Sequence, residues 1–150
     1  MFSKTCEYGI RSAIYVAVQS LEDENRRIKL PEIIEHVDTP VAFTAKILGV
    51  LNKAKIISSK TGPTGGFYVG LDQMKKSKLI QIVDALDGDR VYNGCAMGLD
   101  SCNHENPCPM HEKFISVREE LKVVLETTSL YDMAVSTKSG KTFLSSLNIK

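Results

Sequence analysis

The chain has 150 residues, of which 43% are hydrophobic and 25% are charged, the proportions of one ordinary globular domain. Its 19 basic and 18 acidic residues leave a net charge of +1, so bulk charge gives no argument for binding nucleic acid. No apolar run approaches the roughly 20 residues of a membrane span, and Glu7 and Arg11 interrupt the N-terminal stretch that a signal peptide would need. We therefore expect a cytoplasmic protein with no membrane partner.

Three helices are predicted in the first third of the chain. Apolar residues at helical spacing indicate an amphipathic helix over residues 5–21, and a short second helix begins near Pro31, whose missing N–H is tolerated in a first turn. A third helix follows Pro40, with Thr39 as the expected capping residue. Its expected apolar stripe is Phe43, Ile47, Val50, Leu51 and Ala54.

The second and third helices are followed at once by the segment IISSKTGPTGGFYVG. We predict strands over residues 56–59 and 67–69, with TGPTGG at the tip, where glycines allow positive φ. This order is typical of a winged helix-turn-helix. A further helix is predicted to end near Gly88. The expected fold class is therefore mainly α with a small β-wing.

The segment from Thr39 to Leu71 contains lysines but no aspartate or glutamate. A surface that approaches phosphate groups must be free of carboxylates, which would repel the DNA backbone. In a helix-turn-helix, the N-terminal residues of the second helix reach the bases in the major groove. The predicted groove contacts are Thr39, Val41, Ala42, Thr44, Ala45 and Lys46, and the predicted phosphate contacts are Lys53, Lys60, Thr61 and Thr64. A winged helix that contacts only protein is the alternative.

A heptad pattern follows further along the chain. Met110, Phe114, Val117, Leu121, Val124 and Thr128 are spaced 4, 3, 4, 3 and 4 residues apart. We expect a long helix that pairs with a second copy of the chain, with the dimerisation residues Phe114, Val117, Leu121 and Val124. A helix that packs only on its own domain is the alternative.

These elements predict four parts of the chain. Residues 1–88 form the expected DNA-binding domain, residues 89–109 a cysteine-rich loop, and residues 110–135 the dimerisation helix region, in which SLYDMA adds a short helix. Residues 136–150 are rich in serine and lysine and are expected to be a loosely held tail.

The segment CAMGLDSCNHENPCPMH, residues 95–111, holds three of the four cysteines and two of the three histidines. The spacing Cys95-x6-Cys102-x5-Cys108-x2-His111 lets three thiolates on a loop rich in glycine, asparagine and proline converge on one point. Clustered cysteines in a reducing cytosol are more often metal ligands or redox sensors than structural disulfides. We favour an iron–sulfur cluster, with His111 or Glu7 as the candidate fourth ligand.

Three rival interpretations of this segment are open. A structural zinc site uses the same residue types, although the usual Cys-x2–4-Cys pair is missing. A disulfide switch between two of the cysteines needs no ligand. A zinc deaminase is the enzyme interpretation, but His104 and Glu105 are adjacent and His111 stands where the signature has its final cysteine. Cys6 lies on the apolar stripe of the first helix and is expected only to fill the core.

As a set, four segments resemble the IscR/NsrR-type winged-helix transcription regulators, the Rrf2 family. They are SKTCEYGIRSAIYVA at the start, LPEIIEHVDTPVAFTAKILGVLNKAKII across the helix-turn-helix, SSKTGPTGGFYVG in the wing, and the three-cysteine loop that leads into the long helix. The resemblance implies a homodimer joined through the long C-terminal helix, with two winged helices on a near-palindromic operator in double-stranded DNA.

The resemblance also implies a cofactor. Family members with three cysteines in this loop bind a [2Fe–2S] or [4Fe–4S] cluster, and the residue-for-residue match assigns the thiolates to Cys95, Cys102 and Cys108. His111 matches the fourth ligand of one branch, while Glu7 matches a carboxylate that another branch supplies from the partner subunit. We therefore expect a repressor, not an enzyme, whose operator affinity is controlled by a cluster that senses nitric oxide, redox state or iron–sulfur status.

Two positions depart from the family pattern. The wing usually reads Ser-x-Arg-Gly, but Thr61 stands where the arginine belongs, beside Lys60. Lysine imitates an arginine in a narrow minor groove poorly, so the operator preference need not follow that of relatives. Lys55 replaces the glycine that commonly follows the recognition helix, and it is strained if the position keeps a positive φ.

Overall fold

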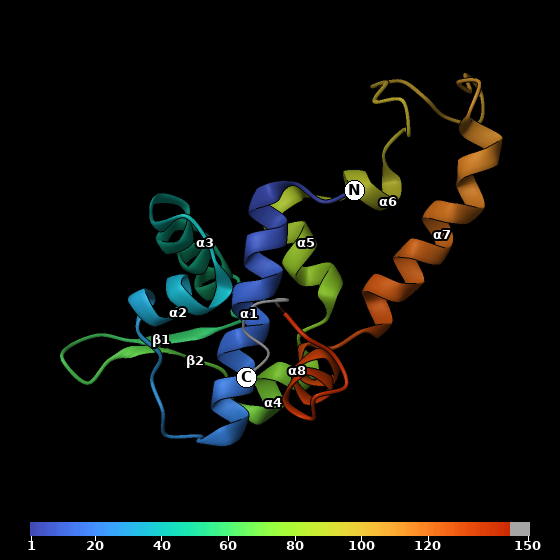
Figure 1. The fold of residues 1–150 in the computed structure, drawn as a ribbon. Helices are drawn as coiled ribbons and strands as arrows, with labels where there is room; N and C mark the ends of the chain where they lie inside the picture. The colour runs from blue at the N-terminus through green and yellow to red at the C-terminus, as the bar shows by residue number, and fades with distance from the viewer. Residues whose placement is uncertain (145–150) are drawn as a thin grey trace.

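A computed structural model describes residues 1–144, and Figure 1 shows a mainly helical molecule with one small antiparallel sheet. Its elements in chain order are α1 (Lys4–Glu22), α2 (Leu30–Val37), α3 (Val41–Lys53), β1 (Ser58–Lys60), β2 (Gly66–Tyr68), α4 (Leu71–Lys76), α5 (Leu79–Asp87), α6 (Arg90–Asn93), α7 (His111–Thr127) and α8 (Leu130–Lys138). The expected fold class is confirmed. None of the described helices has the length and apolar character that crossing a bilayer requires.

Helix α1 lies at the centre because apolar or small residues occupy most of its circumference. It packs against α2, α3, α5, α8 and β2. Its start is capped by Ser3, whose hydroxyl accepts the N–H of Cys6 at 3.0 Å. Gly9 allows a close approach, since a Cβ there would collide with Leu86 of α5 and lie 3.3 Å from Ile47 of α3. One central helix thus fixes the positions of α3 and α5 together.

The turn between α2 and α3 differs from the prediction. Asp38 takes a left-handed conformation, with a φ of 54°, directly after α2. Pro40, not Thr39, occupies the capping position of α3. Thr39 is buried, and its hydroxyl lies 2.8 Å from the hydroxyl of Thr44. The capping role predicted for Thr39 is therefore wrong, because its hydroxyl bonds to a side chain of α3 instead of a backbone N–H.

The buried side of α3 is also rotated relative to the prediction. Thr44, Ile47, Leu48 and Leu51 are buried, while Phe43 is exposed. Either residue is compatible with a helical stripe, because Phe43 lies four residues before Ile47 and Thr44 lies three residues before it, and both spacings place side chains on the same face. Thr44 fits inside because its hydroxyl lies 2.6 Å from the carbonyl oxygen of Pro40, which satisfies the buried polar group.

The wing is a two-stranded antiparallel sheet extended by one residue of an earlier segment. β1 pairs with β2 so that Ser59 faces Phe67. Ile28 then pairs with Phe67 from the other side, through N–H to carbonyl distances of 2.9 and 2.8 Å. The first predicted strand begins too early, because Ile56 and Ile57 are both buried in the core and neither alternates toward solvent.

Three C-terminal features differ from the prediction. α4 and α6 are short helices without a strong sequence signal, and α8 belongs to the core of the winged helix, where Leu130 and Ala134 are fully buried. The start of α8 is held by a backbone hydrogen bond, in which the N–H of Leu130 donates to the carbonyl oxygen of Ser77 at 2.8 Å. The packed core therefore extends beyond the predicted limit of residue 88. The predicted tail begins inside α8, and its residues 145–150 lie outside the described residues.

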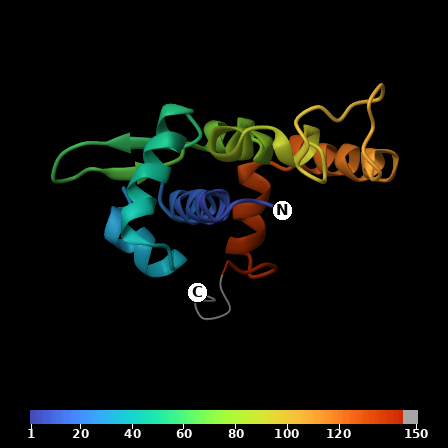
Figure 2. The ribbon, with the colours of Figure 1, turned by 90° about the horizontal axis from the view of Figure 1, so that it is seen from above.

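Helix α7 leaves the rest of the molecule as an arm. In Figure 1 it runs away from α5 and carries the cysteine loop at its far end. Figure 2 shows that the wing and α7 lie at opposite ends of the molecule. Within α7, His111 and Leu125 are the buried residues. This helix lies where the heptad pattern predicts a long helix after the cysteine segment.

Candidate metal centre and nucleic-acid interface

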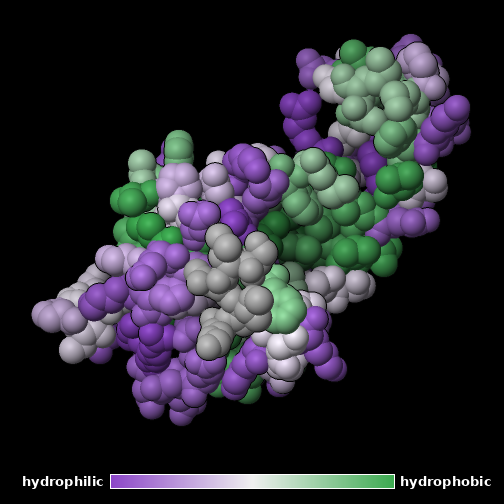
Figure 3. Space-filling model, viewed as in Figure 1, coloured by the Kyte–Doolittle hydropathy of each residue, from purple (hydrophilic) through white to green (hydrophobic). Residues whose placement is uncertain are grey.

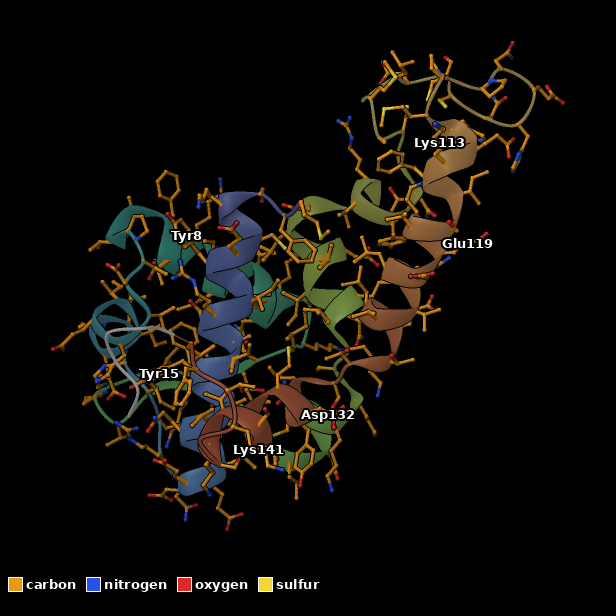
Figure 4. All side chains as sticks on the ribbon, turned by 45° about the vertical axis from the view of Figure 1, so that its right-hand side comes forward. Tyr8, Tyr15, Lys113, Glu119, Asp132 and Lys141 are labelled. Carbon is orange, nitrogen blue, oxygen red and sulfur yellow. The ribbon has the colours of Figure 1, made fainter. Side chains whose placement is uncertain are left out.

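The loop between α6 and α7 brings its three cysteines together. The Sγ atoms of Cys95, Cys102 and Cys108 all lie within 4.8 Å of one another, and those of Cys95 and Cys108 are 3.5 Å apart. Figure 4 shows this loop beyond the end of α7 that carries Lys113. The predicted convergence of the three cysteines is confirmed, and thiols at these separations can share one metal centre.

Two tight turns make this convergence possible. Gly98 has a φ of 77°, and its N–H donates to the carbonyl oxygen of Cys95 at 2.9 Å, which folds the chain back after the first cysteine. The side-chain oxygen of Asn103 accepts the N–H groups of Glu105 and Asn106, each at 2.9 Å. The glycine and asparagine content of the loop therefore has a structural cause.

Backbone N–H groups point at the sulfur atoms. The N–H of Met97 donates to the Sγ of Cys95, and the N–H of Cys108 donates to the Sγ of Cys102, each at 3.4 Å. Hydrogen bonds from the backbone of Leu99 and of Met97 lower the pKa of Cys95 to about 7. Such donors stabilise the thiolate, which is the form of cysteine that binds metal ions.

His111 is the first residue of α7 and lies beside the thiols. It is 6% exposed, and its Nδ1 lies 3.2 Å from the Sγ of Cys102. Its Nε2 is buried and has no hydrogen-bond partner within residues 1–144. A buried polar atom without a partner needs an explanation, and a bound ion is one such explanation. The donor set therefore fits a sulfur-rich metal centre with an imidazole at its edge.

Glu7, the other candidate ligand, is placed elsewhere. It lies on α1, where its carboxylate pairs with Lys4 at 3.1 Å. It is not a member of the cysteine group, and Figure 1 shows α1 in the body of the molecule and the loop at the end of the arm. His111 is not a member of that group either, but within one chain the structure brings its ring to Cys102 and leaves Glu7 apart.

The fourth cysteine, Cys6, is separate from this group. It is fully buried in an apolar cluster with Val83, Tyr92 and Leu125. Burial, followed by the neighbouring charge of Asp87, raises the pKa of its thiol to about 12. Cys6 is therefore a neutral thiol at physiological pH, and its predicted core-filling role is confirmed.

Two contacts fasten the cysteine loop to α7. At one end of the loop, Arg118 donates to the carbonyl oxygen of Gly94, directly before the first cysteine. Nearer the middle, the ring of His111 contacts Cys102. The heptad pattern places Arg118 outside the seam and gives no sign of this bond, which depends on the loop folding back over α7. Both contacts tie the loop to the first two turns of α7.

The candidate groove-facing residues of α3 divide into two groups. Val41, Ala42, Ala45 and Lys46 are exposed, as is Lys53 at the end of the helix. Thr39 and Thr44 are buried and bonded to each other. The prediction that these two threonines contact the groove is therefore wrong. Phe43, which was expected inside, takes a place on the exposed side.

The wing presents Lys60, Thr61 and Thr64 to solvent, as predicted for phosphate contacts. Its tip is held by Lys29, whose Nζ donates to the carbonyl oxygens of Pro63 and Gly65 at 3.1 and 3.0 Å. Sequence reasoning missed this residue because Lys29 lies far from the wing in sequence. These two hydrogen bonds place the ammonium group of Lys29 against the backbone of the wing tip.

The predicted dimerisation residues lie on α7 with unequal exposure. Val117 and Val124 are each 53% exposed, whereas Phe114 and Leu121 are partly buried. Leu121 packs on the cluster around Leu125, which joins the arm to α5. Figure 3 shows apolar surface extending from the body along the arm. One side of α7 thus packs within the chain, and another apolar side is left open.

Comparison with known proteins identifies the family. The family model named Rrf2, described as an iron-dependent transcriptional regulator, matches residues 2–136. The chain belongs to the Rrf2 family. A protein of Aquifex aeolicus described as an HTH-type transcriptional regulator is 25% identical over 135 residues, which cover 89% of this chain and 90% of that protein.

Two solved structures have the same fold. The structure of CymR (YrzC), the global cysteine regulator of B. subtilis, superposes with a TM-score of 0.72 at 21% identity and covers 90% of this chain and 96% of its own. The structure of T. potens IscR gives a TM-score of 0.70 at 18% identity and covers 95% and 91%. As a member of the Rrf2 family, the chain is a DNA-binding transcription regulator and not an enzyme, which removes the deaminase interpretation.

Proposed function

We propose that this Rrf2-family regulator is a dimeric repressor whose affinity for a near-palindromic operator is controlled by an iron–sulfur cluster. Cys95, Cys102 and Cys108 would hold a [2Fe–2S] or [4Fe–4S] cluster. The observation that supports this most strongly is the convergence of the three thiols to within 4.8 Å at the start of α7. Thiolates are the ligands that such clusters prefer.

The spacing of the donors favours iron and sulfide over structural zinc. Three cysteines and one histidine are also a common structural zinc set, but such sites usually contain a Cys-x2–4-Cys pair, which this loop lacks, and His111 lies outside the cysteine group. When bound, a cluster with a weak or exchangeable fourth ligand supplies a centre that small oxidants and nitric oxide can reach. His111 is the fourth ligand available within one chain, and Glu7 is available only from a second copy.

The proposed DNA-binding surface joins α3 to the wing. Ala42, Ala45 and Lys46 would face the major groove, while Lys53, Lys60, Thr61 and Thr64 would contact phosphates. Residues 39–71 carry no carboxylate, so nothing in this segment opposes the approach of a polyanion.

The proposed dimer forms through α7. Phe114, Val117, Leu121 and Val124 would form the seam with the same helix of a second subunit. An exposed valine pair on a helix that already leaves the body of the molecule indicates a surface that another chain covers.

Control of DNA binding would pass through the start of the arm. The loop is attached to α7 by His111 and Arg118, and α7 packs on α5, which in turn packs on α3. Loss or change of the cluster would shift the loop and α7, and with them the spacing of the two recognition helices. The coupling of the metal site and the DNA site would therefore be a difference in free energy between two arrangements of the dimer.

The test is operator binding by anaerobically purified protein in three forms: as isolated, after iron removal, and after treatment with nitric oxide. We expect visible absorbance, iron and acid-labile sulfide in the isolated form, and an operator affinity that differs between forms by tenfold or more, in the range of typical couplings. A colourless protein with stoichiometric zinc would rule out the cluster, and equal affinities would rule out control by it.

A thiol switch is the second candidate, because the Sγ atoms of Cys95 and Cys108 lie only 3.5 Å apart and the pKa of Cys95 is lowered to about 7. An oxidant would take two electrons and two protons from this pair to form a disulfide. This candidate predicts a metal-free protein whose operator affinity changes with peroxide and returns with dithiothreitol. Mass spectrometry of alkylated thiols distinguishes it from the cluster.

A further inference from the structure

The exposed side of α3 is mainly apolar. Val41 is 65% exposed and Phe43 is 56% exposed, and Ala42 and Ala45 are exposed beside them. Figure 3 shows apolar surface over α3 on this face of the molecule. Between residues 41 and 49, Lys46 is the single exposed polar side chain.

Packing within the chain does not explain this exposure. The buried side of α3 is already complete, since Thr44, Ile47, Leu48 and Leu51 fill it. A phenyl ring and a valine left in water forgo the free energy of burial, so a surface that covers them is expected.

The surroundings of the patch select the chemistry of its partner. Lys46 and Lys53 flank it along the helix, and residues 39–71 contain no acidic side chain. The partner must therefore present small apolar groups that are flanked by negative charges. The major groove of DNA does so where thymine occurs, because the 5-methyl group of thymine is the apolar group that a base pair presents there, between two rows of phosphates.

We propose that Val41, Phe43 and Ala45 recognise the operator through thymine methyl groups. The inference rests on the proposed function of α3 as the recognition helix. The exposed side chains at these positions have no hydrogen-bonding groups, so they cannot read the donor and acceptor pattern of bases as arginine or asparagine does. Sequence preference then arises from methyl contacts, with Lys46 available as one donor to guanine or phosphate.

Deoxyuridine provides the direct test, because it lacks only the methyl group and keeps every hydrogen-bonding atom of thymine. A duplex is selected from a random pool with the full chain under anaerobic, reducing conditions, and each thymine is then replaced singly. We expect thymines to be enriched in each half-site, and replacement of a contacted one to weaken binding roughly fourfold. Replacement in both half-sites should weaken it by roughly the square of that factor.

The matched variants assign the methyl contacts to α3. Phe43→Ala should lose the sensitivity to deoxyuridine at one or more of these positions, since its phenyl ring is no longer present to contact the methyl group. Phe143→Ala removes another phenyl ring that is 56% exposed, outside α3, and should keep the full sensitivity. Should either variant fail to fold, the deoxyuridine series measured with the unaltered chain still tests whether methyl groups are recognised.

Two results would overturn the inference. If the selected duplex binds equally well with deoxyuridine at every position, methyl recognition is wrong while the proposed repressor function stands. If the full chain selects no duplex at all, with or without its metal, the DNA-binding assignment of α3 fails and the methyl contacts fail with it.

Discussion

The body of the molecule and its arm are stabilised by different means. In the body, α1 to α5 and α8 share an apolar core that includes Val16, Leu48 and Leu130, all fully buried. In residues 95–127, which form the arm, His111 and Leu125 are the buried residues. The contacts of the loop are instead those of sulfur, imidazole and backbone groups.

This difference indicates which part can respond to a signal. An apolar core is stable in water without any ligand, because burial alone is favourable. A loop with three thiols and a helix with exposed valines gain stability when an ion or a second chain binds them, so their arrangement depends on whether these are present. We therefore expect the body to supply a constant DNA-binding surface and the arm to supply the element that varies with a bound ion or a second chain.

The largest effect is expected from removing one thiol of the arm. Cys102→Ala should abolish cluster binding, because two thiols and one imidazole no longer enclose the centre. Iron and sulfide should fall below about a tenth of the unaltered content, and operator affinity should become independent of nitric oxide. Absorbance, metal analysis and a DNA-binding titration measure this.

Cys6→Ala is the matched control for the body. It removes a buried sulfur from the core and should lower the free energy of unfolding by about 1–2 kcal/mol. Its iron content should not change, since Cys6 lies outside the cysteine group. Retention of iron by Cys102→Ala, or its loss from Cys6→Ala, would contradict the assignment of the metal to the arm.

The second effect concerns the body alone. The double variant Lys46→Ala, Lys53→Ala should weaken operator binding by roughly a hundredfold and reduce the log–log salt slope by roughly one to two, because one groove-facing and one phosphate-facing positive charge are lost. Metal content should remain unchanged. Lys113→Ala with Lys141→Ala removes the same charge elsewhere and should leave the slope nearly unchanged; equal losses in both pairs would show that only net charge matters.

The body was largely predictable from sequence because its signals are local. Helical spacing identified α1, α2, α3, α5 and α7, and the glycine-rich tip identified the wing. The errors occurred where two local solutions compete: Phe43 and Thr44 both continue the stripe of α3. Only the bond of the Thr44 hydroxyl to Pro40 and the packing against α1 decide which is inside.

The site was predictable in composition but not in attachment. The spacing of the cysteines predicted their convergence, since three thiols on a turn-rich loop have few other functions. The bonds of Arg118 to Gly94 and of Lys29 to the wing tip were not predictable, because each joins segments that are distant in sequence. Contacts of this kind arise from tertiary packing and leave no periodic signal.

The third effect tests whether a second chain covers the arm. Val117→Asp with Val124→Asp should weaken dimer formation by roughly tenfold or more, because carboxylates would be buried without partners in the seam. Thermal unfolding of the body should change little, since both valines are exposed in the single chain. Val135→Asp, on an exposed position of α8, is the control. Sedimentation measures the association, and an unchanged dimer would place the interface elsewhere.

The smallest effect concerns the backbone directly after α3. Lys55 has a φ of 63°, which confirms the conditional prediction of strain, and Gln73 holds its carbonyl oxygen at 2.9 Å. Lys55→Gly should raise the free energy of unfolding by about 1 kcal/mol, because the left-handed conformation costs a residue with a Cβ about 1–2 kcal/mol and glycine returns part of this as unfolded-state entropy. Lys53→Gly, in the helical end of α3, should instead lower it by about 1 kcal/mol. Opposite signs of the change at two lysines so close together, measured by denaturant unfolding, would show that the strain belongs to this one backbone position of the body, whereas a loss of stability in both variants would show that Lys55 is not strained.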